Sequence, residues 1–205
     1  MTIRGRIAAA VFLLAAFAAS SRAVEVSGEI GGAWSSDMDP VIVTGPSHVP
    51  PGGSLLIEPG MRVLFLPGAG IKVEGFFIAQ GGVAQPVTLD RAGAGCWDSL
   101  SVLPGGMAVL AMCVVRGGGD SAGQANGMLR VDGGELNLYA CDVSGSCTNG
   151  VFVTDGRFAT AARPGPVPEV IARLAELIWD KEGRPAGRER EFRLQAEAAA
   201  QQSVA

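Results

Sequence analysis

The chain has 205 residues, of which 48% are hydrophobic and 18% are charged, a composition that argues against disorder over most of its length. The formal net charge is −4 at pH 7, which argues against a nucleic-acid binder because such proteins present a basic patch. Glycine stands out with 30 occurrences, about twice the roughly 7% of average usage, so we expect many tight turns.

The first 23 residues have the pattern of an export signal. Arg4 and Arg6 precede the unbroken apolar run 7–19, and Ser21-Arg22-Ala23 places small residues at the −3 and −1 positions of a cleavage site before Val24. A membrane-spanning helix needs about 20 consecutive apolar residues, more than this run contains. We therefore expect a cleaved signal peptide over residues 1–23, and a secreted, periplasmic or surface protein without a membrane span.

A short sequence motif recurs over residues 50–160. It consists of aliphatic residues that alternate with polar ones, followed by a turn residue and then glycine. The alternation is typical of a half-buried strand, and glycine or proline ends each strand. Recurrence at such short intervals predicts a solenoid. We expect five residues of successive copies to face inward, namely Ile57, Val73, Val102, Val131 and Val153.

A second set of strands follows the same repeat. Leu110–Gly117 and Leu138–Gly145 align residue for residue at a spacing of 28. This alignment predicts two strands per coil, stacked in register as parallel sheets around an apolar core. The alternative is a β-sandwich, which would not explain why two consecutive coils keep the same residue types at the same offsets.

Several of these runs resemble the opening coils of secreted bacterial right-handed parallel β-helix proteins, namely Val41–Gly45, Val49–Gly60, Val73–Gly75, Ile78–Gly81, Gln85–Leu89 and the Trp-containing stretch Gly95–Leu100. The resemblance covers residues 34–158. It implies an all-β fold, a short right-handed parallel β-helix of about five coils, which we assign to residues 24–160. Since many β-helix proteins are polysaccharide lyases or hydrolases, it also implies carbohydrate as a candidate ligand.

The composition changes after this body. Residues 161–167 contain Pro164-Gly165-Pro166 and are predicted to be a linker. Residues 168–205 are predicted to form an α-helical hairpin, since Pro168 suits a first helical position and apolar residues follow at helical spacing, namely Val170, Ile171, Leu174, Leu177 and Ile178. Residues 168–198 also resemble a small bacterial domain of unknown function, through Trp179 and the Gly-Arg-Pro-x-Gly turn at Gly183–Gly187.

The coil is expected to end near Phe158 and to leave an apolar cross-section there. Open ends of short solenoids invite pairing with another chain. We expect the hairpin, a second copy of the chain, or both to cover this end, so a homo-oligomer through the open coil end is one of the predicted partners.

The four cysteines suggest disulfides in an exported chain. Cys113 and Cys141 occupy equivalent positions on adjacent coils, about 4.8 Å apart, so they form either a disulfide or a ladder of stacked thiols that act as small hydrophobes. Cys96 and Cys147 lie in predicted turns and can pair only if those turns meet. The chain has no Cys-x-x-Cys motif and a single histidine, His48, so no metal and no other cofactor is expected.

Catalytic candidates are sparse. Lyases of the β-helix fold need clustered acids for calcium and a basic residue for proton abstraction, and hydrolases need a pair of carboxylates close together. We assign no catalytic residue. If the body is enzymatic, the candidates are Asp90, Arg91 and Asp98, the compact acidic and basic group near a predicted strand end. The aromatic residues fall mostly on apolar strand positions, which favours a place in the core.

We therefore expect an exported, non-enzymatic scaffold that binds or adheres at the cell envelope, with carbohydrate or an envelope protein as its partner. The alternative is a polysaccharide lyase-like or hydrolase-like enzyme, or an inactive remnant of one. A third hypothesis makes the hairpin over 168–205 the partner-binding module and the coil its carrier.

Overall fold

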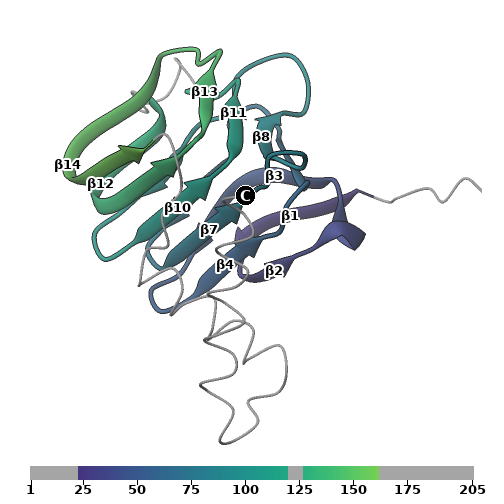
Figure 1. Ribbon diagram of the computed structural model, residues 1–205, viewed down its shortest axis with the longest axis horizontal. Helices are drawn as coiled ribbons and strands as arrows, with labels where there is room; N and C mark the ends of the chain where they lie inside the picture. The colour runs from purple at the N-terminus through teal and green to yellow at the C-terminus, as the bar shows by residue number, and fades with distance from the viewer. Residues whose placement is uncertain (1–22, 120–126, 162–205) are drawn as a thin grey trace, which may run out of the picture.

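The structure, a computed structural model, describes residues 23–119 and 127–161. Apart from one short 3-10 helix, Ser36–Met38, the elements assigned in these residues are β-strands. Every pairing between the strands is parallel. The strands stack turn upon turn into an all-β solenoid of about five turns (Figure 1). The predicted parallel solenoid is thereby confirmed.

The strands form one continuous ladder that wraps around three faces. The first face contains β1 (Val24–Glu29), β3 (Val41–Val49), β5 (Arg62–Phe65), β8 (Val87–Arg91), β11 (Cys113–Arg116) and β13 (Asp142–Ser144). The second face contains β6 (Gly70–Val73), β9 (Leu100–Val102), the second half of β3, and the first halves of β12 (Gly127–Tyr139) and β14 (Asn149–Ala161).

The third face contains β2 (Gly32–Trp34), β4 (Ser54–Ile57), β7 (Phe76–Gln80), β10 (Met107–Ala111) and the second halves of β12 and β14. β1, β3, β12 and β14 each take part in two faces, because they run through a corner of the coil. These long strands make the ladder continuous.

The length of a turn varies along the chain. On the first face one turn separates the paired residues Val24 and Val41, which are 17 positions apart, whereas Val115 and Val143 are 28 positions apart. Leu110 pairs with Leu138 at the same spacing of 28. The residue-for-residue alignment predicted for these two strands is therefore confirmed.

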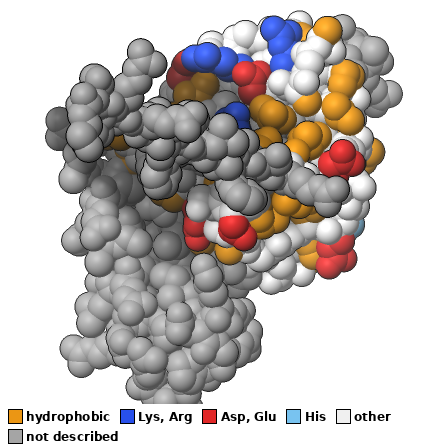
Figure 2. Space-filling model, turned by 90° about the vertical axis from the view of Figure 1, so that its right-hand side faces the viewer, with side chains coloured by type: hydrophobic (Ala, Val, Ile, Leu, Met, Phe, Trp, Pro, Cys, Tyr) orange, Lys and Arg blue, Asp and Glu red, His pale blue; other side chains and the backbone are white. Residues whose placement is uncertain are grey.

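The core fills the interior of the coil with apolar side chains from all three faces. On the second face Val73, Val102 and Val131 are paired in register and are completely buried. On the third face alternate residues point inward, as Phe77 and Ala79 do in β7. Outside the core, Figure 2 shows hydrophobic side chains on one face interspersed with acidic and basic ones.

Ile57 is buried as predicted, but it does not belong to the column of Val73. Ile57 lies in β4 on the third face, where it pairs with Trp34 and Ala79. The residue of the preceding turn that pairs with Val73 is Val49. β4, which ends at Ile57, and β6, which ends at Val73, are followed by the same kind of turn. The same sequence motif therefore occurs at two different corners of the coil.

Val153, the fifth residue predicted to face inward, is 42% exposed. Its backbone pairs in register with Val131, so it occupies the inward column and the register itself holds. It is exposed because β14 belongs to the last described turn. Phe158, in the column of the buried Leu136, is 40% exposed for the same reason. The cover expected for this end, the hairpin or a second copy of the chain, lies outside the described residues.

Two predicted segments fall largely or wholly outside the described residues: the signal peptide over 1–23 and the helical hairpin over 168–205. The first described strand begins at Val24, the residue after the predicted cleavage site, and the last ends at Ala161. Among the described residues, no helix has the length and apolar character needed to cross a membrane.

Candidate functional site

The corner between the second and third faces is built from glycine. Gly75, Gly106, Gly134 and Gly156 take this corner in successive turns, and a Cβ atom at any of them would clash with backbone atoms of the turn before. The turns are also joined here by hydrogen bonds, for example from the N–H of Met107 to the carbonyl of Gly75 at 2.8 Å. The turns therefore pack more closely at this corner than a side chain at any of these four positions would allow.

A shallow groove of about 510 Å³ lies over this corner. Beside Gly106, Gly134 and Gly156, it is lined by the residues that directly follow the four corner glycines in sequence: Phe76, Met107, Glu135 and Arg157. These four residues are paired from turn to turn and form one column at the start of the third face. The sequence analysis missed them, although the recurring glycine followed by the lining residue was a signal that could have found them.

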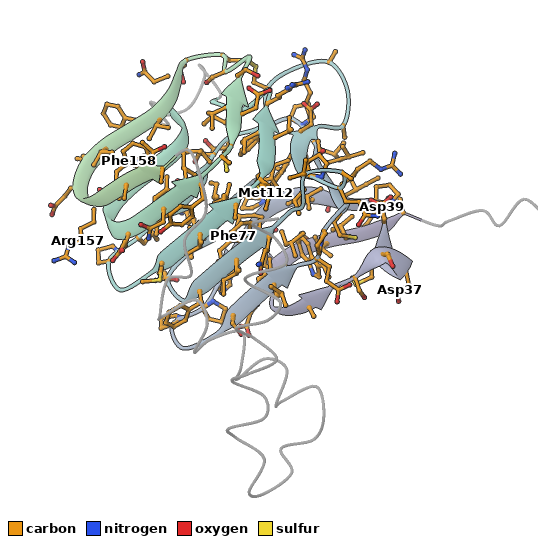
Figure 3. All side chains as sticks on the ribbon, viewed as in Figure 1. Asp37, Asp39, Phe77, Met112, Arg157 and Phe158 are labelled. Carbon is orange, nitrogen blue, oxygen red and sulfur yellow. A yellow bond between two sulfur atoms is a disulfide. The ribbon has the colours of Figure 1, made fainter. Side chains whose placement is uncertain are left out.

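The chemistry of the groove changes along its length. Phe76 and Met107 are half-buried and give it an apolar part, while Glu135 and Arg157 bring opposite charges to adjacent strands. The Glu135 carboxylate accepts a hydrogen bond from Nδ2 of Asn137 at 3.0 Å, which orients it. Arg157 extends outward from β14 at the left of Figure 3. An open groove with an apolar part and a charged end can hold an extended ligand across several turns.

Asp90 and Arg91 lie together at the end of β8, where the N–H of Arg91 donates to the Asp90 carboxylate at 2.7 Å. Both side chains border Gly117 of the next turn. Asp98 lies farther along the same loop, where its N–H donates to the carbonyl of Ala69 at 2.7 Å and its own carbonyl accepts from Gly119 at 2.7 Å. The structure thus brings Asp90 and Arg91 together and places Asp98 beyond the buried Trp97.

Other charged side chains of the body form exposed ion pairs. Arg62 binds Asp39 with an N–O distance of 2.9 Å, and Arg116 binds Asp142 of the next turn at 2.6 Å. The hydrogen bond from Arg116 lowers the pKa of the Asp142 carboxyl. Because both pairs are exposed to solvent, which screens their attraction, they contribute little to the stability of the fold.

Cys96 and Cys147 form a disulfide, with 6.5 Å between their Cα atoms. It joins the loop after β8 to the loop before β14. In the second of these loops, the N–H of Cys147 also donates a hydrogen bond to the carbonyl of Gly118 at 2.8 Å. The two predicted turns therefore meet, which the sequence analysis had left open.

Cys113 and Cys141 are free thiols at equivalent positions of successive turns. Cys113 is buried, and its Sγ contacts the carbonyls of Ala79 and Ala111 at 3.4 and 3.3 Å. Cys141 is half-buried beside it. Burial raises the pKa of Cys113 well above 9.0, whereas the hydrogen bond with Cys113 lowers the pKa of Cys141 to about 7. The pair thus contains one inert thiol and one that ionises near neutral pH.

Alkylation by iodoacetamide should therefore modify Cys141 at a rate that rises with pH and is half-maximal near pH 7, because the thiolate is the reactive form. Mass spectrometry of the modified peptides measures this rate. In a Cys113→Ala variant the hydrogen bond is lost, so the half-maximum should move upward toward pH 9. A half-maximum near pH 9 in the unmodified chain would contradict the pairing.

No group of three His, Cys, Asp or Glu side chains within residues 23–119 and 127–161 is placed to hold a metal ion. Of the eight aromatic residues of the body, Trp34, Phe65, Phe77 and Trp97 are buried in the core, as predicted. The other four are not: Phe76, Tyr139 and Phe152 are half-buried, and Phe158 is exposed.

Residues 167–202 are similar to a family described as "Protein of unknown function (DUF2934)". This match overlaps the segment 168–198 that resembles a domain of unknown function, and it lies outside the described residues. No curated protein and no solved structure matches the chain.

Proposed function

We propose that this protein is an exported, non-enzymatic β-solenoid scaffold that binds an extended carbohydrate of the cell envelope. The observation that carries the proposal is the groove over the glycine corner, which is open along the solenoid and lined by one residue from each of four turns. Neighbouring turns lie about 4.8 Å apart, so the groove offers a new side chain at each step of an extended polymer.

The lining suits a carbohydrate better than a compact ligand. Phe76 and Met107 provide apolar surface for the faces of sugar rings, while Glu135 and Arg157 provide an acceptor and a donor for hydroxyl or acidic groups. A cell-envelope protein is the second candidate partner, since an extended peptide segment could occupy the same groove.

Two features support export. Residues 1–23 have the pattern of a signal peptide, and the Cys96–Cys147 disulfide is typical of an oxidising compartment outside the cytoplasm. We infer that the mature chain begins at Val24 and functions in the periplasm, at the cell surface or in the medium.

Three further parts of the proposal concern the whole chain. We infer that the coil is right-handed, because connections between parallel strands are right-handed in about 98% of cases. We infer that residues 168–205 form the helical hairpin that their apolar spacing predicts. The exposed Val153 and Phe158 at the open end, beside the long edge strand β14, support pairing with a second copy of the chain.

The alternative, a polysaccharide lyase-like or hydrolase-like enzyme, rests on Asp90 and Arg91. These two side chains lie together at the end of β8 next to Gly117, where an acid and a base could act on one substrate.

Groove variants test the scaffold proposal. The probes are soluble polygalacturonate, alginate and purified peptidoglycan sacculi, with binding measured by co-sedimentation or affinity electrophoresis. We expect at least one polymer to retain the protein and a Phe76→Ala/Met107→Ala variant to be retained roughly tenfold less, because both apolar contacts are removed. Leu64→Ala, which removes a half-buried side chain from the first face, should bind like the unmodified chain. Equal retention of both variants, or no retention by any probe, would contradict the proposal.

A further inference from the structure

The two free thiols have the same kind of surroundings, one turn apart. The Sγ of Cys113 contacts the carbonyl of Ala79 in the preceding turn at 3.4 Å, and the Sγ of Cys141 contacts the carbonyl of Leu110 in its own preceding turn at 3.3 Å. Ala79 and Leu110 are paired with each other. Each sulfur also contacts the carbonyl of the residue two positions before it. The corner between the third and first faces therefore holds both sulfur atoms in one repeated orientation.

The backbone brings the two thiols together. The residues that directly follow them, Val114 and Asp142, are paired in register across β11 and β13. Directly before the first thiol, the N–H of Met112 donates to the carbonyl of Tyr139 at 2.8 Å. Neighbouring strands lie about 4.8 Å apart, which falls within the Cα separations of about 4.4–6.8 Å that disulfides accept. A bond between the two sulfur atoms is therefore compatible with the pairing of these turns.

The two thiols differ in how easily a reagent reaches them. Cys113 is 1% exposed, and Val87 pairs with it in the preceding turn. Cys141 is half-buried, and its hydrogen bond with Cys113 lowers its pKa to about 7. The thiolate is the nucleophile in exchange with a disulfide. An oxidant therefore reacts first with Cys141, and with Cys113 only through Cys141.

We propose that Cys113 and Cys141 form a thiol–disulfide exchange site, at which Cys141 is the attacking thiol, Cys113 is the resolving thiol and a small-molecule disulfide is the oxidant. In the first step the Cys141 thiolate attacks one sulfur of the small disulfide, so that a mixed disulfide forms and one thiolate leaves and takes up a proton. In the second step Cys113 gives up its proton and attacks the sulfur of Cys141, which releases the second small thiol. The two cysteines together lose two electrons, and the small disulfide is reduced to two thiols.

The first step favours the second. Burial, the hydrogen bond with Cys141 and the negative charge of Cys141 raise the pKa of Cys113, in that order. The mixed disulfide removes the negative charge from position 141, so this charge no longer opposes the ionisation of Cys113. The product is a second disulfide that joins two successive turns, which makes this corner of the solenoid responsive to the redox state of its surroundings.

Oxidised glutathione tests the site in the full chain. Mass spectrometry first confirms the two free thiols and the Cys96–Cys147 disulfide. The chain is then incubated with oxidised glutathione, quenched with acid and digested without reduction. We expect a peptide that links Cys113 to Cys141, with the Cys96–Cys147 link retained as the internal reference. A glutathione adduct on Cys141 as the final product, or two thiols that stay free, would overturn the proposal.

Two matched variants separate the roles of the thiols. Cys113→Ala lacks the resolving thiol, so its reaction should stop at the glutathione adduct on Cys141. Cys141→Ala keeps only the buried thiol, and the adduct on Cys113 should form roughly tenfold more slowly, or slower still, than the adduct on Cys141 in the first variant. Equal rates in the two variants would overturn the assignment of attacking and resolving thiols.

Discussion

Replacing Trp97 by alanine should lower the free energy of unfolding by roughly 3–5 kcal/mol, the usual cost of truncating a buried Trp. The indole is completely buried and stacks on Phe65 with 4.4 Å between ring centroids and 16° between ring planes. Its Nε1 also donates a hydrogen bond to the carbonyl of Arg116 in the next turn, at 2.7 Å. The variant loses the packing and leaves that carbonyl without this donor. Urea unfolding of the purified chain measures the difference.

Two controls separate these contributions. Trp97→Phe keeps an aromatic ring against Phe65 but lacks the indole N–H, so we expect an intermediate loss of about 1–3 kcal/mol. Val83→Ala truncates a side chain that is 80% exposed, and its effect should stay within about 0.5 kcal/mol. A loss below about 1 kcal/mol for Trp97→Ala would show that Trp97 does not hold the turns together.

Removing the Cys96–Cys147 disulfide should cost about 4 kcal/mol. The two cysteines are 51 positions apart, and closing a loop of that length reduces the entropy of the unfolded chain by roughly this amount. The bond ties the loop before β14 to a loop two turns earlier, so the last described turn should open first when it is lost. The midpoint of thermal unfolding of a Cys96→Ser/Cys147→Ser variant, compared with that of the unmodified chain, measures the effect.

Reduction supplies the matched control for this prediction. Dithiothreitol should lower the unfolding midpoint of the unmodified chain to that of the double variant, and should leave the double variant unchanged because Cys113 and Cys141 are already free thiols. If dithiothreitol shifted both proteins equally, the stabilisation would have another source.

Strands that stack on each other in successive turns are separated in sequence by the length of one turn. Where that length stays constant, the same residue types recur at a fixed spacing, and the repeat could therefore be predicted from the sequence. Leu110 and Leu138 show this, as does the pair Met112 and Ala140, which share the rare positive φ values of 49° and 50° at the same step of successive turns. The equivalence of Cys113 and Cys141 followed from the same offset.

The assignment of Ile57 to a column failed for a physical reason. Strands end in proline–glycine or acid–glycine turns at more than one corner of the coil, so the motif that ends β4 looks like the motif that ends β6. Turn length also varies, from 17 to 28 positions on the first face, and a sequence without a fixed period does not say which corner a motif belongs to. The exposure of Val153 depends on what lies beyond the last turn, which local alternation does not encode.

The candidate site was harder to predict than the fold because the glycines that line it carry no side chains. The sequence predicts that Gly106 and Gly134 are turn residues. Only the stacking of the turns shows that they lie next to each other along the groove. Met107 and Glu135 look like ordinary strand residues until that arrangement is known. Charged residues that lie close together in sequence are a more visible signal, and Asp90, Arg91 and Asp98 were predicted for that reason.

The central claim is that the solenoid binds an envelope polymer without cleaving it, and assaying turnover under binding conditions tests this most directly. The full chain is incubated with polygalacturonate and with alginate, with and without calcium, and the release of unsaturated or reducing sugar ends is followed over time. The proposed function predicts no release above that of a heat-denatured sample, while retention on the polymer persists. Release that is catalytic and disappears in Arg91→Ala would contradict it and establish the enzyme instead.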